Sequence, residues 1–397
     1  MKIRLLLVAG ARPNYMKIAP IYWAIRDSRV FREAIEAEII HTGQHYDAAL
    51  SDDFFRDLDL PAPAVNLGVG SGSHAEQTAK VMIGFEKVLQ EHRADVVLVV
   101  GDVNSTAACA MVTAKAYGCT PSGEGRPLLA HVEAGLRSRD LAMPEEVNRL
   151  VTDALSDILF TTSGDADENL RAEGVNEDKI ERVGNTMIDS LLRSLAAAEQ
   201  EELPAAMTAA AESGGFGLCT LHRPSNVDDR ETLSGILSAL SEIAAETPLF
   251  LPIHPRTRAR IEAFGLGAHL KPATEATENA RGIFVIEPLS YLQMLCAQRR
   301  SAFVLTDSGG LQEETTVLGI PCVTIRDNTE RPITITEGSN VLAGTSRAGI
   351  LRGLAEAKQK VARGTRTPEL WDGQAGERIV AELVQRCSGK KENRAVA

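Results

Sequence analysis

Short apolar runs alternate with longer amphipathic stretches along the first half of the chain. The runs have the length of buried strands, and they are Ile3–Ala9, Glu38–Thr42, Val96–Gly101, Leu128–Glu133 and Asp157–Thr161. Strands that alternate with helices build parallel sheets that are covered by helices on both faces. The pattern therefore predicts an α/β fold with a doubly wound, Rossmann-like sheet.

The stretch 74–91 has the clearest helical signal. Ser73 and Glu76 form a capping box at its start. Apolar residues then recur at helical spacing, and the face that we expect to be buried consists of Ala75, Thr78, Met82, Phe85 and Leu89.

The alternation resumes after an Ala- and Glu-rich stretch at 195–213. The strands predicted there are Gly217–Leu221, Leu249–His254, Gly282–Ile286, Ala302–Thr306 and Cys322–Ile325. Since 397 residues are many for one core, we divide the chain into two Rossmann-like domains, 1–187 and 188–372, with the boundary near Gly184–Leu191. Gly376–Val384 is then a helix with no strand after it, and a polar tail follows Cys387. Ligands of such sheets bind beyond the carboxyl ends of the strands, so we expect a deep cleft between the domains.

Charge and composition narrow the classes of ligand. The formal net charge is −12 and only 4% of residues are aromatic, which argues against nucleic acid and anionic membranes as partners. The six cysteines form no C-x-x-C pair and lie mostly in apolar runs, as in a protein of a reducing compartment. Lys2 and Arg4 before an apolar run resemble a minimal signal peptide, but a buried strand that ends at Arg12-Pro13 explains these residues better. We expect a cytoplasmic location.

Polar residues follow the predicted strands of the first domain. Arg12 and Lys17 follow the first strand, where two cations suit a phosphate, and the dinucleotide fingerprint G-x-G-x-x-G is missing there. Asp102 follows the third strand, Glu133 ends the fourth, and Glu145 and Glu146 stand at a helix start, where capping is the simpler role for one of them. Separated acids at one cleft serve as proton donor and acceptor when their surroundings differ.

The second domain offers residues for a diphosphate. His222 and Arg223 follow its first strand, and the imidazole can protonate a departing phosphate oxygen; His254, before Pro255, is better explained as structural. Ser308, Gly309 and Gly310 join a strand to a helix, so that backbone N–H groups can approach a phosphate. Glu314 lies one turn further on, within reach of ribose hydroxyls, and Arg331 lies in a charged loop after the last strand.

Ten segments in order resemble the non-hydrolysing UDP-N-acetylglucosamine 2-epimerase family. They are GARPNYMKIAP, HTGQHYD, GDVNSTAA, HVEAGLRS, MPEEVNR, VGNTMID, TLHRPSNVD, PIHPRTR, DSGGLQEE and RDNTERPIT. The resemblance implies a glycosyltransferase-B-like architecture in which the final helix, within 373–397, packs back on the first domain. It also implies reversible inversion of carbon 2 of UDP-N-acetylglucosamine, giving UDP-N-acetylmannosamine, by elimination of UDP to 2-acetamidoglucal and re-addition.

The same resemblance assigns roles to residues. It implies catalytic roles for Lys17, Asp102, Glu133, Glu145 and His222, and a UDP site at Arg12, Ser308, Gly309, Gly310, Glu314 and Arg331. The chemistry fits these residues, because expulsion of UDP acidifies the proton on carbon 2. The cations can stabilise the departing UDP, and the carboxylates can remove and return the proton. The reaction requires no metal or redox cofactor. We expect a UDP-sugar as partner and a homodimer as the assembly.

Two features depart from the family pattern. Bacterial members activated by a second UDP-N-acetylglucosamine molecule often carry a basic residue after the Gln-His pair, where this chain has Tyr46. Residues 120–127 lengthen the loop before the Glu133 strand. The alternatives are a hydrolysing 2-epimerase, a 2-epimerase of a UDP-diacetamido sugar, a glycosyltransferase and an inactive UDP-sugar sensor. The retained acids and His222 favour an enzyme over the sensor.

Overall fold

The computed structural model describes residues 2–43, 58–276 and 280–395, without the side chains of Arg12 and of 389–395. The chain divides into two compact units. Unit 1 comprises Met1–Ser190 and Glu369–Ala397, and unit 2 comprises Leu191–Pro368. In the described part of the chain, no helix has both the length and the apolar character required to cross a membrane.

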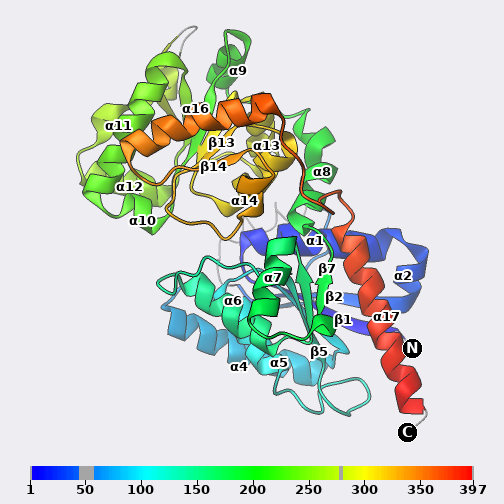
Figure 1. Cartoon of the computed structure of the whole chain (residues 1–397). Coiled ribbons are helices and arrows are strands. Elements are labelled where there is room, and N and C mark those ends of the chain that lie inside the picture. The colour runs from blue at the N-terminus through cyan, green and yellow to red at the C-terminus, as the bar shows by residue number, and fades with distance from the viewer. Residues whose placement is uncertain (1, 44–57, 277–279, 396–397) are drawn as a thin grey trace. The chain divides into compact units, whose positions relative to one another are not determined.

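Unit 1 is built on a sheet of seven strands that all run parallel (Figure 1). Its strands are β1 (Ile3–Ala9), β2 (Ile35–His41), β3 (Val65–Asn66), β4 (Val96–Val100), β5 (Leu128–Ala134), β6 (Ile158–Thr161) and β7 (Ile180–Arg182). The order β3-β2-β1-β4-β5-β6-β7 reverses direction between β1 and β4. In doubly wound sheets the ligand site lies beyond the strand ends at this point.

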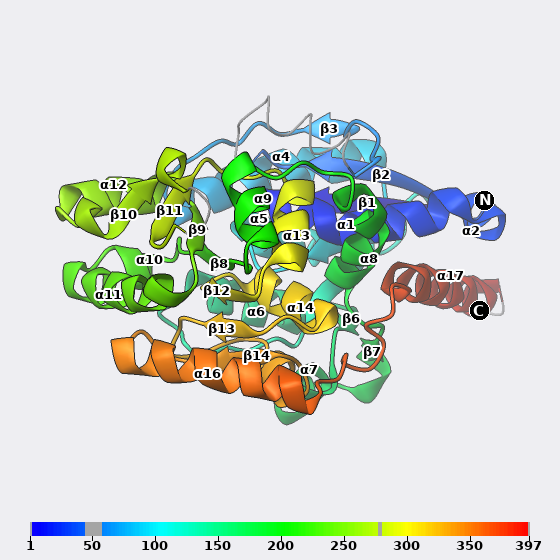
Figure 2. The ribbon, with the colours of Figure 1, turned by 90° about the horizontal axis from the view of Figure 1, so that it is seen from above.

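Helices cover both faces of this sheet. They are α1 (Arg12–Asp27), α2 (Arg29–Ala34), α4 (His74–His92), α5 (Asn104–Thr113), α6 (Pro144–Leu155), α7 (Gly164–Ala172), α8 (Thr186–Ala198), which runs on into unit 2, and α17 (Ala375–Ala395); a short 3₁₀ turn, η1, spans Glu177–Lys179. One core packs α4 and α5 against β1, β4 and β5. Helix α17 lies beside α1 and α2 (Figures 1 and 2), and Gly376 is packed so closely on the Pro20 carbonyl that a Cβ would lie 2.5 Å from its oxygen.

Unit 2 repeats the same strand order. Its parallel strands are β8 (Gly217–Thr220), β9 (Leu249–Pro252), β10 (Leu270–Pro272), β11 (Ile283–Ile286), β12 (Phe303–Thr306), β13 (Cys322–Thr324) and β14 (Asn340–Leu342). The order β10-β11-β9-β8-β12-β13-β14 reverses between β8 and β12. Both units therefore have the Rossmann-like arrangement that the hydrophobic pattern predicts, which confirms the predicted fold class.

The helices of unit 2 also form two layers. They are α9 (Ala205–Glu212), α10 (Pro224–Val227), α11 (Arg230–Glu246), α12 (Pro255–Ala263), α13 (Tyr291–Arg300), α14 (Gly309–Leu318), α15 (Ile333–Thr336) and α16 (Arg347–Arg363), with 3₁₀ turns η2 (Gly267–His269) and η3 (Ala273–Glu275). One core joins α11, α12 and α16 to the sheet, and a second core joins α9 and α13 to its other face. These cores fix the strand ends from which the site residues project.

The prediction of which face of α4 is buried was wrong for three of its five residues. The helix and its capping box form as expected, but the buried residues are Gln77, Val81, Phe85, Val88 and Leu89. Only Phe85 and Leu89 belong to both sets. Ala75, Thr78 and Met82 instead line an open groove between α4 and α6. The spacing of the apolar residues did not show that a second, partly apolar stripe of α4 lies toward α6.

Candidate active site

The loop after β1 is fastened to the end of β4. Asn14 on α1 accepts hydrogen bonds from the backbone N–H groups of Gly10 at 3.0 Å and Ala11 at 2.9 Å. Its amide nitrogen donates to the Val100 carbonyl at 3.2 Å. This buried side chain sets the start of α1, and so the position of Lys17, relative to the turn that carries Asp102.

Lys17 and Glu133 form an ion pair in which both side chains are buried. Lys17 lies on α1, and Glu133 lies on β5. The pair packs against Gly101, where an added Cβ would lie 2.9 Å from Lys17 Nζ and 3.4 Å from Glu133 Oε2. Gly101 also has φ +66°, a left-handed conformation that glycine adopts without strain. The strand end therefore needs glycine both for its backbone and for the space beside the ion pair.

Glu133 itself has a left-handed backbone, with φ +72°. For a residue with a long side chain this conformation costs about 1–3 kcal/mol, and such strain concentrates at functional sites. The register between β5 and β6 shifts between Val132 and Ala134, so Glu133 is the extra residue of a bulge. The bulge aims a side chain that regular pleating would direct elsewhere.

Asp102 pairs with a buried arginine of α6. The Arg149 guanidinium binds the carboxylate of Asp102 and, at 2.6 Å, that of Glu146. Asn148 donates to the Asp102 carbonyl at 2.9 Å. The Asp102 side chain remains 29% exposed, against 5% for Glu133, so the two carboxylates stand in different surroundings.

The structure separates the two acids at the start of α6. Glu146 is buried and accepts from the backbone N–H groups of Ser138 at 3.0 Å and Arg139 at 2.9 Å. Burial opposes it, but hydrogen bonds from Ser138 and Arg149 hold the pKa of Glu146 below its ordinary value. Glu145 is half-buried and, within the described ranges, has no hydrogen-bond or ion-pair partner. Glu146 thus anchors a loop, whereas the Glu145 carboxylate is available.

Two predicted features of the first domain lie partly or wholly outside the described residues. Arg12 is the first residue of α1, but its side chain is not described. The Gln-His pair and Tyr46 lie within 44–57 and are outside the described residues as well.

In unit 2, His222 and Asp307 meet at the point where the strand order reverses. His222 follows β8 and Asp307 follows β12. Asp307 Oδ1 lies 2.7 Å from His222 Nδ1, and its carboxylate also accepts from the backbone N–H groups of His222 and Arg223 and from Asn226. Although burial opposes it, the His222 hydrogen bond holds the pKa of Asp307 below its ordinary value. Nδ1 is taken up by this carboxylate, and the His222 side chain remains 42% exposed.

Ser308, Gly309 and Gly310 form the start of α14. Ser308 N–H donates to Thr306 Oγ1 at 2.9 Å, whereas the Ser308 hydroxyl caps no helix N–H. A Cβ on Gly309 would lie 2.6 Å from Arg331 Nη1, so the guanidinium is stacked directly on this backbone. Free N–H groups, a hydroxyl and a guanidinium together make an anion site.

Three arginines converge on the buried Glu330. Its carboxylate lies 2.5 Å from Arg331, 2.8 Å from Arg326 and 3.6 Å from Arg223. Burial opposes it, but the charges of these arginines hold the pKa of Glu330 well below its ordinary value. Arg331 also binds Glu313 at 2.8 Å. These ion pairs fix the Arg331 guanidinium beside the α14 N-terminus.

Glu314 is buried beneath this site. It accepts a hydrogen bond from Gln298 of α13 at 2.6 Å, and burial raises the pKa of Glu314 to about 7. Burial and the nearby Glu314 also raise the pKa of Tyr291, whose buried hydroxyl has no hydrogen-bond partner among the described residues. Glu314 is therefore held by one amide, with hydrogen-bonding capacity left for a ligand.

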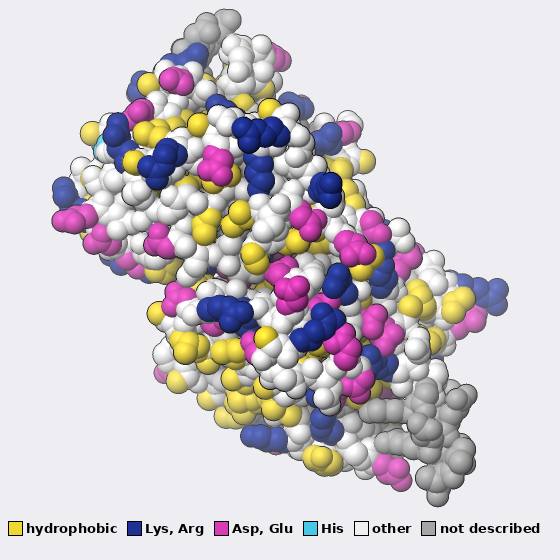
Figure 3. All heavy atoms as spheres, in the orientation of Figure 1, with side chains coloured by type: hydrophobic (Ala, Val, Ile, Leu, Met, Phe, Trp, Pro, Cys, Tyr) yellow, Lys and Arg dark blue, Asp and Glu magenta, His cyan; other side chains and the backbone are white. Residues whose placement is uncertain are grey.

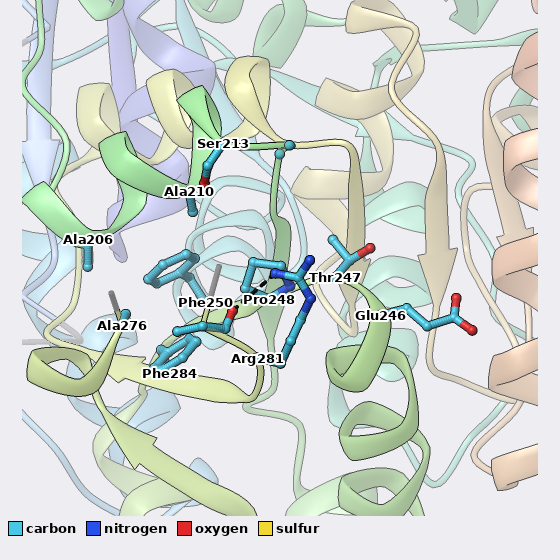
Figure 4. Close-up of a pocket in the computed structure, with 13 residues that line it drawn as sticks. Ala206, Ala210, Ser213, Glu246, Thr247, Pro248, Phe250, Ala276, Arg281 and Phe284 are labelled. Atoms are coloured by element: carbon cyan, nitrogen blue, oxygen red, sulfur yellow. Dashed lines mark hydrogen bonds between the residues drawn. The ribbon is translucent and has the colours of Figure 1, made fainter. Parts of the chain in front are cut away.

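Figure 4 shows a cavity at the amino ends of the strands of the unit 2 sheet, opposite the carboxyl ends that carry the candidate site. Phe250, Phe284 and Arg281 line it, together with residues of α9, and its volume is about 30 Å³, room for about one water. Pro248 and Gly215, which precede β9 and β8, belong to the same lining. The cavity is thus at the amino ends of the strands, away from His222 and Ser308. His254, for its part, caps α12 by accepting from the Arg256 N–H at 3.2 Å.

The sequence missed the residues that hold the predicted ones. Arg149, Asp307, Gln298 and Glu330 form buried contacts to candidate site residues. His131 and Asp153 bind the backbone of Gly101, which precedes Asp102, and of Gly135, two residues after Glu133. Most of them lie inside the very motifs that led to the site, but a motif does not show which of its polar residues touch the ligand and which support the others. Among the described residues, no group of three or more His, Cys, Asp or Glu could hold a metal ion.

Two Rossmann-like units in series, each with charged residues at its switch point, place the chain among proteins with a glycosyltransferase-B-like fold. A UDP-glucosyltransferase from Polygonum tinctorium shares this architecture, with a TM-score of 0.57 over 97% of this chain and 98% of that chain, at 12% identity.

Residues 29–384 match the family model described as UDP-N-acetylglucosamine 2-epimerase. The UDP-N-acetylglucosamine 2-epimerase of Methanocaldococcus jannaschii is 40% identical over 96% of this chain and 99% of its own length. Its crystal structure in complex with UDP-GlcNAc and UDP has a TM-score of 0.82, covering 96% and 100% of the two chains at 39% identity. The UDP-2,3-diacetamido-2,3-dideoxy-D-glucuronate 2-epimerase of Pseudomonas aeruginosa is 40% identical over 87% of this chain and 89% of its own. The chain belongs to the UDP-N-acetylglucosamine 2-epimerase family.

Proposed function

We propose that this enzyme interconverts UDP-N-acetylglucosamine and UDP-N-acetylmannosamine without hydrolysis, by elimination of UDP and its re-addition. The observation that carries the proposal is the arrangement at the end of the unit 1 sheet, where Lys17 pairs with Glu133 and Asp102 and Glu145 stand on the adjoining turns. A protein that only bound UDP would have no use for these separate acids.

Breaking the bond from carbon 1 to the diphosphate comes first in the proposed reaction. Carbon 2 has no neighbouring carbonyl, so direct loss of its proton is prohibitively slow. As UDP departs, positive charge develops at carbon 1 and acidifies that proton. Arg331, the Ser308 hydroxyl and the α14 N-terminus are proposed to hold the diphosphate, with Arg12 contributing a further cation and Glu314 accepting from the ribose. His222 Nε2, oriented by Asp307, is proposed to protonate the departing oxygen.

The proton on carbon 2 must leave one face and return to the other. Asp102, Glu133 and Glu145 are the proposed carriers, and their different exposure supports a division into a proton acceptor and a proton donor. Lys17 is proposed to keep Glu133 ionised and in place. The planar glucal intermediate then accepts UDP back on carbon 1 and the proton on carbon 2, which completes the inversion with no net consumption of water.

A UDP-diacetamido uronic acid is the second candidate substrate. The relative from Pseudomonas aeruginosa that is named for this sugar is 40% identical over 87% of this chain, and the one from Methanocaldococcus jannaschii is 40% identical over 96%. The chemistry at carbons 1 and 2 is the same for both sugars. They differ at carbons 3 and 6, so the two candidates share every residue role proposed above.

We also propose that the enzyme acts in the cytoplasm as a homodimer. Hydrophobic side chains gather on the face of unit 1 that carries α4 and α6 (Figure 3), and Leu141 and Val147 are 69% and 46% exposed there. A second copy of the chain is the occupant that we propose for this surface. Analytical ultracentrifugation of Leu141→Glu tests it: a monomer is expected, and an unchanged dimer would contradict this surface.

A proton NMR time course in deuterated buffer tests the proposed function. UDP-N-acetylglucosamine should approach a mixture with UDP-N-acetylmannosamine, and deuterium should enter at carbon 2. Accumulation of UDP and free N-acetylmannosamine would assign the chain to the hydrolysing class instead. If neither occurs, the UDP-diacetamido uronic acid is tried next, and inertness toward both sugars would contradict the proposal.

A further inference from the structure

Two backbone positions determine the geometry of the unit 1 site. Glu133 has a left-handed φ of +72° within the β5 bulge, and Gly101, with φ +66°, precedes Asp102. A strained residue keeps its conformation only where the surrounding structure holds it. The contacts that hold these positions are therefore part of how the acids are aimed.

Asp153 of α6 binds the bulge on both sides of Glu133. Its Oδ1 lies 2.6 Å from Nδ1 of His131, two residues before Glu133. Its Oδ2 accepts from the backbone N–H of Gly135, two residues after Glu133, at 3.0 Å. Since one carboxylate binds both flanks, it fixes the chain on either side of the left-handed residue.

His131 connects Asp153 to the end of the neighbouring strand, β4. Its Nε2 lies 2.9 Å from the carbonyl oxygen of Gly101, so the ring joins Asp153 to the turn that carries Asp102. The His131 side chain is 0% exposed and that of Asp153 is 2% exposed. A single side chain thus connects the backbones that carry two of the proposed acids.

Both ring nitrogens of His131 have a fixed oxygen partner, the Asp153 carboxylate at Nδ1 and the Gly101 carbonyl at Nε2. Burial opposes it, but the interactions with His131 and Arg137 hold the pKa of Asp153 below its ordinary value. The ring therefore cannot turn without losing one of these two contacts. Arg137 lies 2.7 Å from Asp153 Oδ2 and 2.7 Å from Glu173, so these two ion pairs complete the network.

We propose that Asp153 and His131 are positioning residues, which hold Glu133 and the Asp102 turn in the geometry that proton transfer requires. They act through the backbone and neither is a catalytic residue. The proposal rests on the proposed function, and it gives a reason why a histidine with two hydrogen-bond partners is buried two residues before a proposed catalytic acid. Displacement of a reacting group by about 1 Å lowers the rate by about 100-fold, which sets the size of the expected effect.

The test compares Asp153→Asn and His131→Gln with Asp157→Asn as a matched control. Asp157 binds the same strand at its other end, accepting from Leu129 N–H at 2.9 Å and from Arg126 at 2.7 Å. We expect kcat to fall about 100-fold in the first two variants, with KM and the Kd of UDP within about threefold of the wild type. The control should keep kcat within about threefold, at a comparable loss of thermal stability.

Each other result overturns the proposal. Unchanged kcat in folded Asp153→Asn would show that the contacts of Asp153 are dispensable for catalysis. An equal fall in kcat in Asp157→Asn would show that these contacts contribute only to the general stability of the fold. If Asp153→Asn does not fold, His131→Gln is judged by the same criteria. Amide hydrogen exchange at Gly135, whose N–H donates to Asp153, gives a readout that is independent of activity. We expect exchange at least about tenfold faster in Asp153→Asn than in the wild type and unchanged in Asp157→Asn. Equal rates in Asp153→Asn and the wild type would contradict the network even if the wild type proved inactive toward every UDP-sugar.

Discussion

Lys17 and Glu133 lie far apart in the sequence and form a buried ion pair at the carboxyl end of β5. The Glu133 side chain is only 5% exposed, and Lys17 supplies the opposite charge that a buried carboxylate needs. The pair also places this acid beside the turn of Asp102. The proposed chemistry at carbon 2 depends on this arrangement.

Replacement Glu133→Gln keeps the size of the side chain and an oxygen for Lys17, but removes the base. We expect kcat to fall by about 10²- to 10⁴-fold, the usual contribution of a general acid or base. The Kd of UDP, measured by titration calorimetry, should stay within about twofold, because the proposed UDP contacts lie in unit 2. Loss of UDP binding together with turnover would indicate a structural role for Glu133 instead.

Removal of the Lys17 ammonium should lower the free energy of unfolding more than Glu133→Gln does. Lys17→Met leaves the Glu133 carboxylate buried without the charge that Lys17 supplies, and breaking one side of a buried ion pair costs about 3–5 kcal/mol. Urea unfolding should show this loss of unfolding free energy. The double variant Lys17→Met, Glu133→Gln should recover part of it, and a double variant no more stable than Lys17→Met would contradict the pairing.

Asp307 is expected to act through His222. Asp307→Asn disturbs the hydrogen bond to His222 Nδ1, and kcat should fall by about 10²- to 10⁴-fold, as when a catalytic histidine loses its orienting carboxylate. The combination with His222→Gln should be no slower than His222→Gln alone, because residues that act as one unit are not additive. Multiplicative losses in the double variant would show that Asp307 has a separate role.

Gly309→Ala tests the anion site at the start of α14. The new Cβ would lie 2.6 Å from Arg331 Nη1 and 2.9 Å from its Cζ, so the guanidinium must move off its position. We expect the Kd of UDP to rise by about tenfold or more, the effect of losing about 1.4 kcal/mol. Gly235→Ala in α11 is the control, since no atom lies within 4 Å of its added Cβ. That variant should bind UDP normally and gain about 0.5–1 kcal/mol of stability.

The pH dependence of stability should report the buried Glu314. Its pKa is raised from an ordinary value of 4.5 to about 7, so between these pH values the folded protein keeps a proton that the unfolded chain releases. The free energy of unfolding therefore falls as pH rises from 4.5 to 7, by about 3 kcal/mol from this group. Asp189, with a pKa raised to about 6, contributes in the same direction. Subtracting the pH profile of the unfolding free energy of Glu314→Gln from that of the wild type isolates the contribution of Glu314. Identical profiles of the two proteins would contradict the raised pKa.

The sequence predicted the central strands well and the outer ones poorly. Ile3–Ala9 and the strands that begin at Val96, Leu128 and Cys322 agree with the structure, because they are apolar runs buried on both faces. The edge strands β3, β7, β10 and β14 were not predicted, since each has only two or three residues and polar side chains among them. Helix α17 also continues beyond the predicted end, to Ala395.

The candidate site was predictable as a set of strand ends but not as a set of contacts. A parallel sheet brings residues such as His222 and Asp307 together whatever the chain length between them, and the pattern locates both. It gives no sign that Asp307 serves His222, that Glu146 binds a loop while Glu145 does not, or that Gln298 of another helix reaches Glu314. Those relationships depend on side-chain directions fixed only by packing.

The most direct test of the account is positional isotope exchange in UDP-N-acetylglucosamine that carries ¹⁸O between carbon 1 and the β-phosphorus. If UDP leaves and returns, the β-phosphate rotates in the site and the label moves from the bridging to the non-bridging positions, which phosphorus NMR detects. We predict that scrambling accompanies epimerisation and that Glu133→Gln suppresses both. Epimerisation with the label retained in the bridge would contradict the elimination of UDP on which the account rests.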